Sequence, residues 1–196
     1  MDEIEGETGA TPEAKDAFSV EVARAWEETA NSFHLAGTRL TLMRTSMVFA
    51  IIPGGVFHVL RRLARCGLGG TMAGGSQIVS WIHEADFCRA VQWLIEHPSL
   101  SGVVNLAAPN PLPNREMMRG VRSHCGLPLG IPIPLTLLEI GAFLLRTETE
   151  LVIKSRRVVP RRLLESGFRF EYPEFEPATE ELEQRSNRRK KGDGSI

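Results

Sequence analysis

The chain has 196 residues, of which 42% are hydrophobic and 24% charged, and its formal net charge is −1. This length suits one domain, or a domain with a small appendage, and the composition excludes collagen-like, low-complexity and wholly disordered chains. Because the net charge is close to zero, we expect no binding to nucleic acid or to a membrane. Three separated cysteines without a C-x-x-C pair favour a reducing compartment, so the expected localisation is cytoplasmic.

The first expected helix follows a short acidic start. Residues 1–11 lack the basic and apolar stretches of an export signal and are expected to be disordered. Thr11, Pro12 and Glu13 supply a hydroxyl cap, a proline at the first helical position and an acid near the positive end of the helix dipole. Apolar residues then recur at helical spacing up to Gly37, which predicts an amphipathic helix with one buried face. That face is expected to carry Phe18, Val22, Ala25, Trp26, Thr29, Ala30 and Phe33.

Strand and helix patterns alternate in the next stretch. Residues 38–50 predict a mostly buried strand, and residues 56–66 predict a helix after a Pro-Gly-Gly break. Glycines over 67–75 indicate a loop. A short strand at 77–82 leads into a helix that ends near Pro98. Its N-cap is expected to be Asp86 or Glu84, and its apolar face to consist of Phe87, Ala90, Val91, Leu94 and Ile95.

Residues 103–107 predict an unbroken apolar strand, after which Asn114 is expected to cap a helix that runs toward His124. Helices and strands therefore alternate through the first two thirds of the chain. Such alternation favours an α/β fold with a parallel sheet and right-handed crossovers.

The amino-acid composition changes at Gly126, after which prolines become frequent. A helix to about Arg146 is too short and too interrupted to span a bilayer, and Thr147 to Glu150 has the spacing of a capping box. Pro160 is expected to open a short helix, and residues 168–172 alternate like a strand. The charged residues from 180 onward favour disorder. The expected division is 1–11 disordered, 12–125 an α/β part, 126–179 a small module and 180–196 a disordered tail.

Several segments together resemble one family. They are R-A-W-E (24–27), L-M-R-T (42–45), G-L-G-G (67–70), S-W-I-H-E-A-D (80–86), V-N-L-A-A-P-N-P (104–111) and V-V-P-R-R-L-L-E-S-G-F-R-F-E-Y-P (158–173). In this order, they resemble the later part of the atypical extended short-chain dehydrogenase/reductases, in the sugar-nucleotide epimerase-like group with a small C-terminal domain.

The resemblance implies an incomplete Rossmann-like, NAD(P)-binding sheet and a cleft for a small polar or nucleotide-sugar-like ligand. The strand, G-x-G-x-x-G turn and helix that hold the pyrophosphate in such folds have no counterpart in this sequence. The glycines at 67–75 follow a helix pattern and precede a strand, whereas a phosphate cradle needs a strand before and a helix after. A substrate-side loop is the favoured interpretation of this segment, and no cofactor-binding residue is assigned.

The resemblance also implies a catalytic Tyr-x-x-x-Lys pair, because this spacing sets both groups on one helix face. Aligned through R-A-W-E, the two positions hold Phe18 and Val22, which have no proton to exchange. The single tyrosine, Tyr172, lies in the C-terminal module and has Glu176 four residues later. No catalytic residue is therefore assigned.

Five residues are candidates for substrate binding, and for each of them a structural role is also open. Arg44 ends a strand and would contact a phosphate or carboxylate, or pair with a structural acid. Trp81 and His83 would line the cleft or pack in the core. Asn105 would reach substrate or bond backbone groups. Arg157, with its neighbour Arg156, would hold phosphates or lie on a solvated or ion-paired surface.

The remaining polar residues predict little chemistry. Ser76 stands where the resembled group often has arginine, which removes a phosphate contact. The histidines show no metal-ligand spacing, so no metal site is expected. The basic run 188–191 favours a solvated tail over a nucleic-acid contact or a targeting signal.

We therefore expect a relative of NAD(P)-dependent epimerases or reductases that is inactive as an isolated chain and does not bind NAD(P) alone. The alternative is a non-enzymatic binding or interaction module, a fragment or pseudoenzyme that needs a partner. A parallel sheet without its first strands exposes an apolar edge and face. A second copy or a partner chain is expected to cover it.

Overall fold

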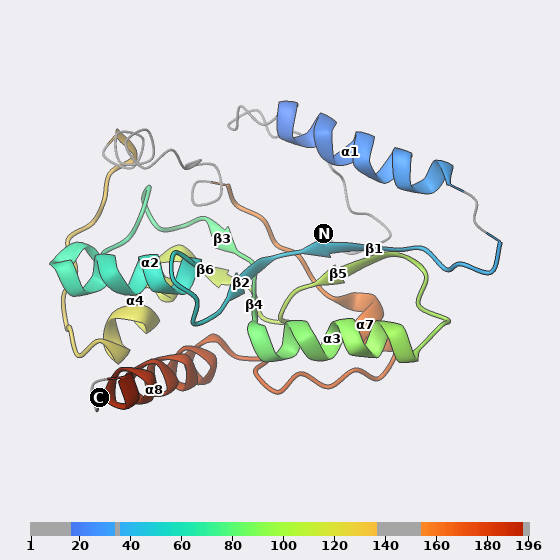
Figure 1. Cartoon of the computed structure of the whole chain (residues 1–196). Helices are drawn as coiled ribbons and strands as arrows, with labels where there is room; N and C mark the ends of the chain where they lie inside the picture. Colours follow the sequence, from blue (N-terminus) through green and yellow to red (C-terminus); the bar gives the residue numbers. More distant parts are fainter. Residues whose placement is uncertain (1–16, 34–35, 137–153, 194–196) are drawn as a thin grey trace.

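The structure of the chain is a computed structural model that describes residues 17–33, 36–136 and 154–193 (Figure 1). The expected disordered start, the cap at Thr11 to Glu13 and the capping box at Thr147 to Glu150 lie outside the described residues, as does most of the helix expected up to Arg146. None of the described helices is long and apolar enough to cross a lipid bilayer.

The described strands pair two by two. Strands β1 and β5 are parallel, β2 and β4 are parallel, and β3 and β6 are antiparallel. Their bounds are β1 Thr41–Thr45, β2 Met47–Phe49, β3 Ile78–Val79, β4 Trp81–His83, β5 Gly102–Leu106 and β6 Leu112–Pro113. The parallel pairs and the helices between them confirm the expected α/β class.

The helices follow the predicted order. They are α1 Ala17–Ser32, α2 Val56–Leu63, the π-helical turn η1 Ala64–Leu68, α3 Glu84–Glu96, α4 Asn114–His124, α7 Arg161–Glu165 and α8 Phe175–Asp193. In Figure 1, the β1–β5 pair lies between α1 on one side and α3 and α7 on the other. The described part of the chain thus places helices on both sides of its parallel strands, as is usual for parallel sheets.

The expected strand over 38–50 is divided into β1 and β2 at Ser46. The Ser46 amide donates to the Leu106 carbonyl at 3.0 Å, and the next amide, of Met47, donates to the Ser80 carbonyl at 3.3 Å. The segment therefore changes its partner strand at this residue, from β5 to β4. A run of apolar residues predicts burial, but the change of partner depends on where β4 and β5 lie.

Two apolar cores hold these elements together. One is centred on Phe49 and Trp81 and extends from α2 to α8, and the other lies between α3, β5 and α7. Both cores include residues from before and after position 126. The second contains Ile82, Ala90, Leu94, Leu100, Val104, Leu106, Leu163 and Phe168.

Helix α1 differs from the prediction in its burial. Phe18 is 76% exposed and Trp26 is 74% exposed, and Phe33 is exposed as well. The expected core face is therefore wrong for Phe18 and Trp26 of this helix and for Phe33, which directly follows it. An amphipathic pattern identifies an apolar face, but it does not supply the surface that covers it. Ile95 of α3, expected on a buried face, is exposed for the same reason.

Two predicted helix caps are also wrong. The N-cap of α3 is His83, whose Nδ1 accepts a hydrogen bond from the Ala85 amide at 3.1 Å, and Asp86 and Glu84 lie inside the helix. Pro113 is the N-cap of α4. The Asn114 side chain is buried and its Oδ1 accepts from the Met72 amide at 2.9 Å, so it holds the glycine-rich loop instead.

Asp86 explains why residues 168–172 do not form the expected strand. Its fully buried carboxylate accepts hydrogen bonds from the amides of Glu171 and Tyr172, at 2.9 and 2.8 Å. These amides are therefore bonded to a side chain and not to a neighbouring strand. The Asp86 carboxylate also pairs with Arg89, which supplies the positive charge that a buried carboxylate needs.

The prediction of a disordered tail from residue 180 is wrong as far as Asp193, because α8 extends to that residue. Leu182 is fully buried in the first core. Glu183 is buried and forms ion pairs with Arg61 of α2 and Arg65 of η1. The low hydrophobicity of this segment favours disorder, but ion pairs and one row of apolar contacts fix it to the domain.

Candidate functional site

Arg44 forms an ion pair with a structural acid. Its Nε and Nη2 bind the two carboxylate oxygens of Glu27, on α1, at 2.7 and 2.8 Å. These hydrogen bonds lower the pKa of Glu27 and raise the pKa of Arg44, and partial burial opposes both shifts. This two-point contact fixes the guanidinium plane. Arg44 thus pairs with a structural acid, which is one of the two roles expected for it. Ligand binding by this side chain stays a prediction.

Asn105 lies opposite Arg44 in the parallel register of β1 and β5. Its side chain is almost completely buried, and Nδ2 donates to the Val159 carbonyl at 3.2 Å. The segment around Arg157 is therefore held against β5. Ser80 adds two bonds to it, since its hydroxyl donates to the Arg156 carbonyl and accepts from the Val158 amide. Arg157 itself is exposed and engaged in a contact of its own.

Trp81 packs in the first core and is fully buried. Its ring meets Phe49 and Phe175 edge to face, with centroids 6.4 and 5.0 Å apart. Its Nε1 donates to the Asn110 carbonyl at 3.0 Å. The indole thus has both its apolar contacts and its hydrogen-bond partner inside the protein, which realises the packing alternative.

His83 is the last residue of β4, is 1% exposed and faces Glu181 of α8. Its Nδ1 accepts from the Ala85 amide, so Nε2 carries the proton and donates to Glu181 at 3.1 Å. The ring also packs on Tyr172, with centroids 4.1 Å apart. Burial lowers the pKa of His83, although Glu181 opposes that shift. Both ring nitrogens are occupied, so the imidazole is a structural connection between α3 and α8.

The five candidates therefore form two groups. One group lies along β1 and β5 and consists of Arg44, Asn105 and the segment of Arg157. The other consists of Trp81 and His83, whose side chains contact residues of α8. The side chains of Arg44, Asn105, Trp81 and His83 all form hydrogen bonds with other groups of the protein. Their roles in substrate binding stay predictions.

The glycine-rich loop packs against another part of the chain. The Gly70 amide donates to the Ile131 carbonyl, and the Ile133 amide donates to the Thr71 carbonyl. A Cβ on Gly70 would stand 2.4 Å from the Ile131 backbone. The missing side chain thus permits the approach of two backbones. The space that a phosphate would need in a glycine cradle is filled by residues 131–133.

The described residues consequently do not fit a dinucleotide by themselves. The glycines at 67–75 lead from η1 into β3. Gly54 and Gly55 do lie between β2 and α2, with Gly55 as the N-cap of α2, but this turn lacks the G-x-G-x-x-G spacing of a dinucleotide cradle. The positions of the expected catalytic pair, Phe18 and Val22, lie on α1 and hold hydrocarbon side chains. Tyr172 is partly buried. Burial is the main cause that raises its pKa, and the charge of Glu171 adds to this rise. Arg185 opposes this rise, and no lysine is among the described groups that shift this pKa.

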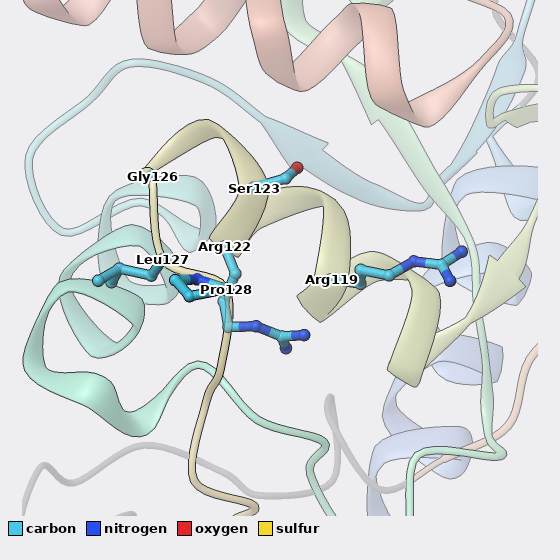
Figure 2. Close-up of a pocket in the computed structure, with 6 residues that line it drawn as sticks. All are labelled: Arg119, Arg122, Ser123, Gly126, Leu127 and Pro128. Atoms are coloured by element: carbon cyan, nitrogen blue, oxygen red, sulfur yellow. The ribbon is translucent and has the colours of Figure 1, made fainter.

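A cavity of about 300 Å³ lies at the C-terminal end of α4, and none of the five predicted residues lines it (Figure 2). Its polar groups come from Arg119, Arg122 and Ser123, and the loop after the helix supplies the other side. These arginines were missed in the sequence, where the only signal is their spacing of three residues on one helix. The complete lining is Arg119, Arg122, Ser123, Gly126, Leu127 and Pro128.

Comparisons with known proteins agree with this architecture. A family model described as a domain of unknown function, DUF1731, matches residues 133–182. The epimerase family protein SDR39U1 of Bos taurus is 32% identical over 170 residues, which are 85% of this chain and 55% of the relative. The epimerase family protein ML0860 of Mycobacterium leprae is 34% identical over 161 residues, with 81% and 51% covered. The chain thus spans about half the length of these curated relatives.

Solved structures show the same relation. The human epimerase family protein SDR39U1, crystallised with NADPH, superposes with a TM-score of 0.80 at 26% identity, over 94% of this chain and 59% of that one. The UDP-N-acetylglucosamine 4-epimerase of Bacillus cereus shares the fold, with a TM-score of 0.66 at 16% identity, over 92% of this chain and 61% of that one.

The fold is therefore that of Rossmann-like, NAD(P)-binding epimerases and reductases. Within this class, the matched part of the chain belongs to the epimerase-like family of atypical short-chain dehydrogenase/reductases, where it corresponds to the C-terminal region.

Proposed function

We propose that this chain forms the substrate-side part of an NAD(P)-dependent epimerase or reductase and is inactive by itself. The human relative with NADPH supports the kind of cofactor, because 94% of this chain superposes on 59% of that protein. In this proposal, the cofactor is held by an N-terminal, glycine-motif half that lies against the described residues. The ligand is a small polar or nucleotide-sugar-like molecule.

The free edge of β1 carries the proposal. Among the described strands, β1 pairs only with β5, so its other edge lacks a neighbour in the described part of the chain. Met43 of β1 is exposed, as are the aromatic side chains Phe18 and Trp26 of the adjoining helix α1. A row of unpaired backbone groups next to apolar side chains is suited to accept a further parallel strand. The half with the cofactor motif supplies such a strand.

The first experiment tests cofactor binding with and without that half. The purified full chain is titrated with NADPH, and tryptophan fluorescence and calorimetry are followed. The titration is repeated after co-expression with the N-terminal region of the Bos taurus relative that this chain does not match. We expect no saturable binding by the chain alone and micromolar binding by the complex. Micromolar binding by the chain alone contradicts the proposal, and so does a failure of the two parts to co-purify.

A non-enzymatic binding module is the second candidate, and it is favoured by Phe18 and Val22 at the positions of the catalytic pair. The two candidates differ in turnover. If the NADPH-loaded complex exchanges no hydride with a set of nucleotide sugars, while it still binds them, the chain serves in binding only. Turnover in the complex that is lost when Arg44 is changed to Ala would instead favour the enzyme.

A further inference from the structure

The side chain of Arg122 is held in a fixed position between two glycines. A Cβ on Gly69 would stand 2.6 Å from the Cγ of Arg122, and a Cβ on Gly130 would stand 2.6 Å from its Cδ. Only glycine at these two positions leaves room for the arginine stem. The guanidinium is also anchored, because Nη1 donates to the Gly69 carbonyl at 2.6 Å. The group is thus positioned before any ligand arrives, and little conformational freedom remains to be lost on binding.

One hydrogen-bond donor of this fixed guanidinium group has no acceptor in the described part of the chain. Its Nε is buried and has no hydrogen-bond partner in the described part of the chain. A buried donor without a partner costs about 1–3 kcal/mol and calls for an explanation. No acidic residue lines the cavity beside it. The positive charge of Arg122 is therefore not neutralised at this place by the described residues.

Arg119 adds a second positive charge to the same cavity. It lies three residues before Arg122 on α4 and is exposed. In Figure 2, its side chain points away from that of Arg122, so the two guanidinium groups do not yet converge. The other polar groups of the lining are occupied: the Ser123 hydroxyl donates to the Gly120 carbonyl, and the amides of Gly126 and Leu127 donate to carbonyls of α4. The donors that the lining offers to a ligand are consequently those of the two guanidinium groups.

We propose that this cavity binds the phosphate group of a small molecule. The fixed Arg122 guanidinium supplies one cation, and the exposed Arg119 side chain supplies a second when it turns toward the cavity. Two guanidinium groups without an acid then match a doubly charged oxyanion, which accepts several charge-assisted hydrogen bonds. A volume of about 300 Å³ holds one or two phosphate groups with a small substituent, which would pack on Leu127 and Pro128. The phosphate site is independent of the proposed cofactor half, because the residues that line it belong to α4 and the following loop.

The test measures binding of inorganic phosphate and of pyrophosphate to the full chain. Calorimetry, or the shifts of backbone amide signals around Ser123 and Leu127, reports saturation. We expect dissociation constants on the order of 1 mM or lower, with pyrophosphate the tighter ligand. Succinate, a dicarboxylate that is doubly charged at neutral pH, is the comparison ligand and is expected to bind at least several-fold more weakly than pyrophosphate.

Variants separate the cavity from general surface charge. Arg119→Gln is expected to weaken pyrophosphate binding about tenfold, the loss that corresponds to one charge-assisted hydrogen bond. Arg115→Gln is the matched control, because it removes an exposed arginine of the same helix that does not line the cavity. It is expected to change the affinity by less than about twofold, since an exposed charge outside the site is screened by salt.

Arg122→Lys tests the fixed guanidinium. It keeps the charge but loses the planar donor set, and the same loss of about tenfold is expected. Should this variant unfold, Arg119→Gln still decides, because Arg119 is exposed. The proposal is overturned if neither phosphate nor pyrophosphate saturates the wild-type chain, if Arg115→Gln and Arg119→Gln weaken binding equally, or if succinate binds as tightly as pyrophosphate.

Discussion

His83 illustrates how one side chain gains a structural role from its surroundings. Its two ring nitrogens join the start of α3 to Glu181 of α8, and its ring packs on Tyr172. Arg185 of α8 lies nearby and forms ion pairs with Glu84 and Glu181. The neutral imidazole is required here, because a second proton on Nδ1 would remove the acceptor of the Ala85 amide.

The sign of the pH dependence follows from the lowered pKa of His83. The unfolded chain takes up the proton near pH 6.5, whereas the folded chain takes it up only at lower pH. The contribution of His83 is thus fully present above about pH 6.5, and it is lost as the pH falls toward the folded pKa. His83→Gln cannot titrate, so we expect its free energy of unfolding to fall less than that of the wild type between about pH 7 and pH 5.5.

Urea unfolding at several pH values measures this difference. His58→Gln is the control, because His58 is exposed on α2. It should keep the slope of the wild type. An unchanged slope in His83→Gln would show that the contact to Glu181 compensates for burial.

At the scale of elements, α8 depends on one buried group of charges. Arg61 of α2 pairs with Glu183 and donates to the hydroxyl of Ser186 at 2.6 Å and to the side chain of Asn187 at 2.9 Å. Arg65 reaches the same carboxylate at 3.0 Å. Because Arg61 and Glu183 are both buried, removing one partner leaves the other poorly compensated.

We therefore expect Arg61→Ala to lower the free energy of unfolding by about 3 kcal/mol. Arg62→Ala is the matched control, since its side chain is exposed on the same helix, and it should change stability by less than about 0.5 kcal/mol. Urea unfolding followed by circular dichroism measures both values. Equal effects of the two variants would mean that α8 does not depend on the buried pair.

At the scale of the whole molecule, the exposed aromatic residues of α1 determine how the chain behaves alone. Phe18 and Trp26 leave an apolar surface beside the free edge of β1. Such surfaces drive association when no partner covers them. We expect the purified chain to form concentration-dependent oligomers, and Trp26→Glu to shift them toward the monomer.

Sedimentation velocity over a range of concentrations tests this expectation. Ile95→Glu is the control, because Ile95 is equally apolar and 70% exposed but lies on α3, on the other side of the strands (Figure 1). A stable monomer of the wild type, or the same shift in both variants, would contradict a role for α1.

Much of the architecture could be predicted from local patterns. The helix pattern at 56–66 after the Pro-Gly-Gly break, the apolar run at 103–107 and the alternation of helix and strand patterns predicted α2, β5 and the α/β class. These elements follow from periodicity, which depends on neighbouring residues alone. The motif order around residues 80–86 and 158–173 also indicated the family, and the relatives agree.

Other features depend on contacts between distant residues. Asp86 was expected to be a helix cap, but it holds the amides of Glu171 and Tyr172, which lie 85 and 86 residues later. The charged residues from 180 onward form a helix because Arg61 and the first core hold them. The cavity beside Arg119 and Arg122 exists because the loop after α4 lies next to these two side chains.

The sequence by itself determined the fold class, the family and the absence of an ionisable pair at Phe18 and Val22, because these depend on residue type and order. The tertiary structure decided which polar groups are already satisfied. Arg44 is bound by Glu27 and His83 by Glu181, whereas the Nε of Arg122 keeps no acceptor in the described residues. The physical reason is that hydrogen bonding and burial depend on the three-dimensional neighbours of a side chain, which local sequence does not specify.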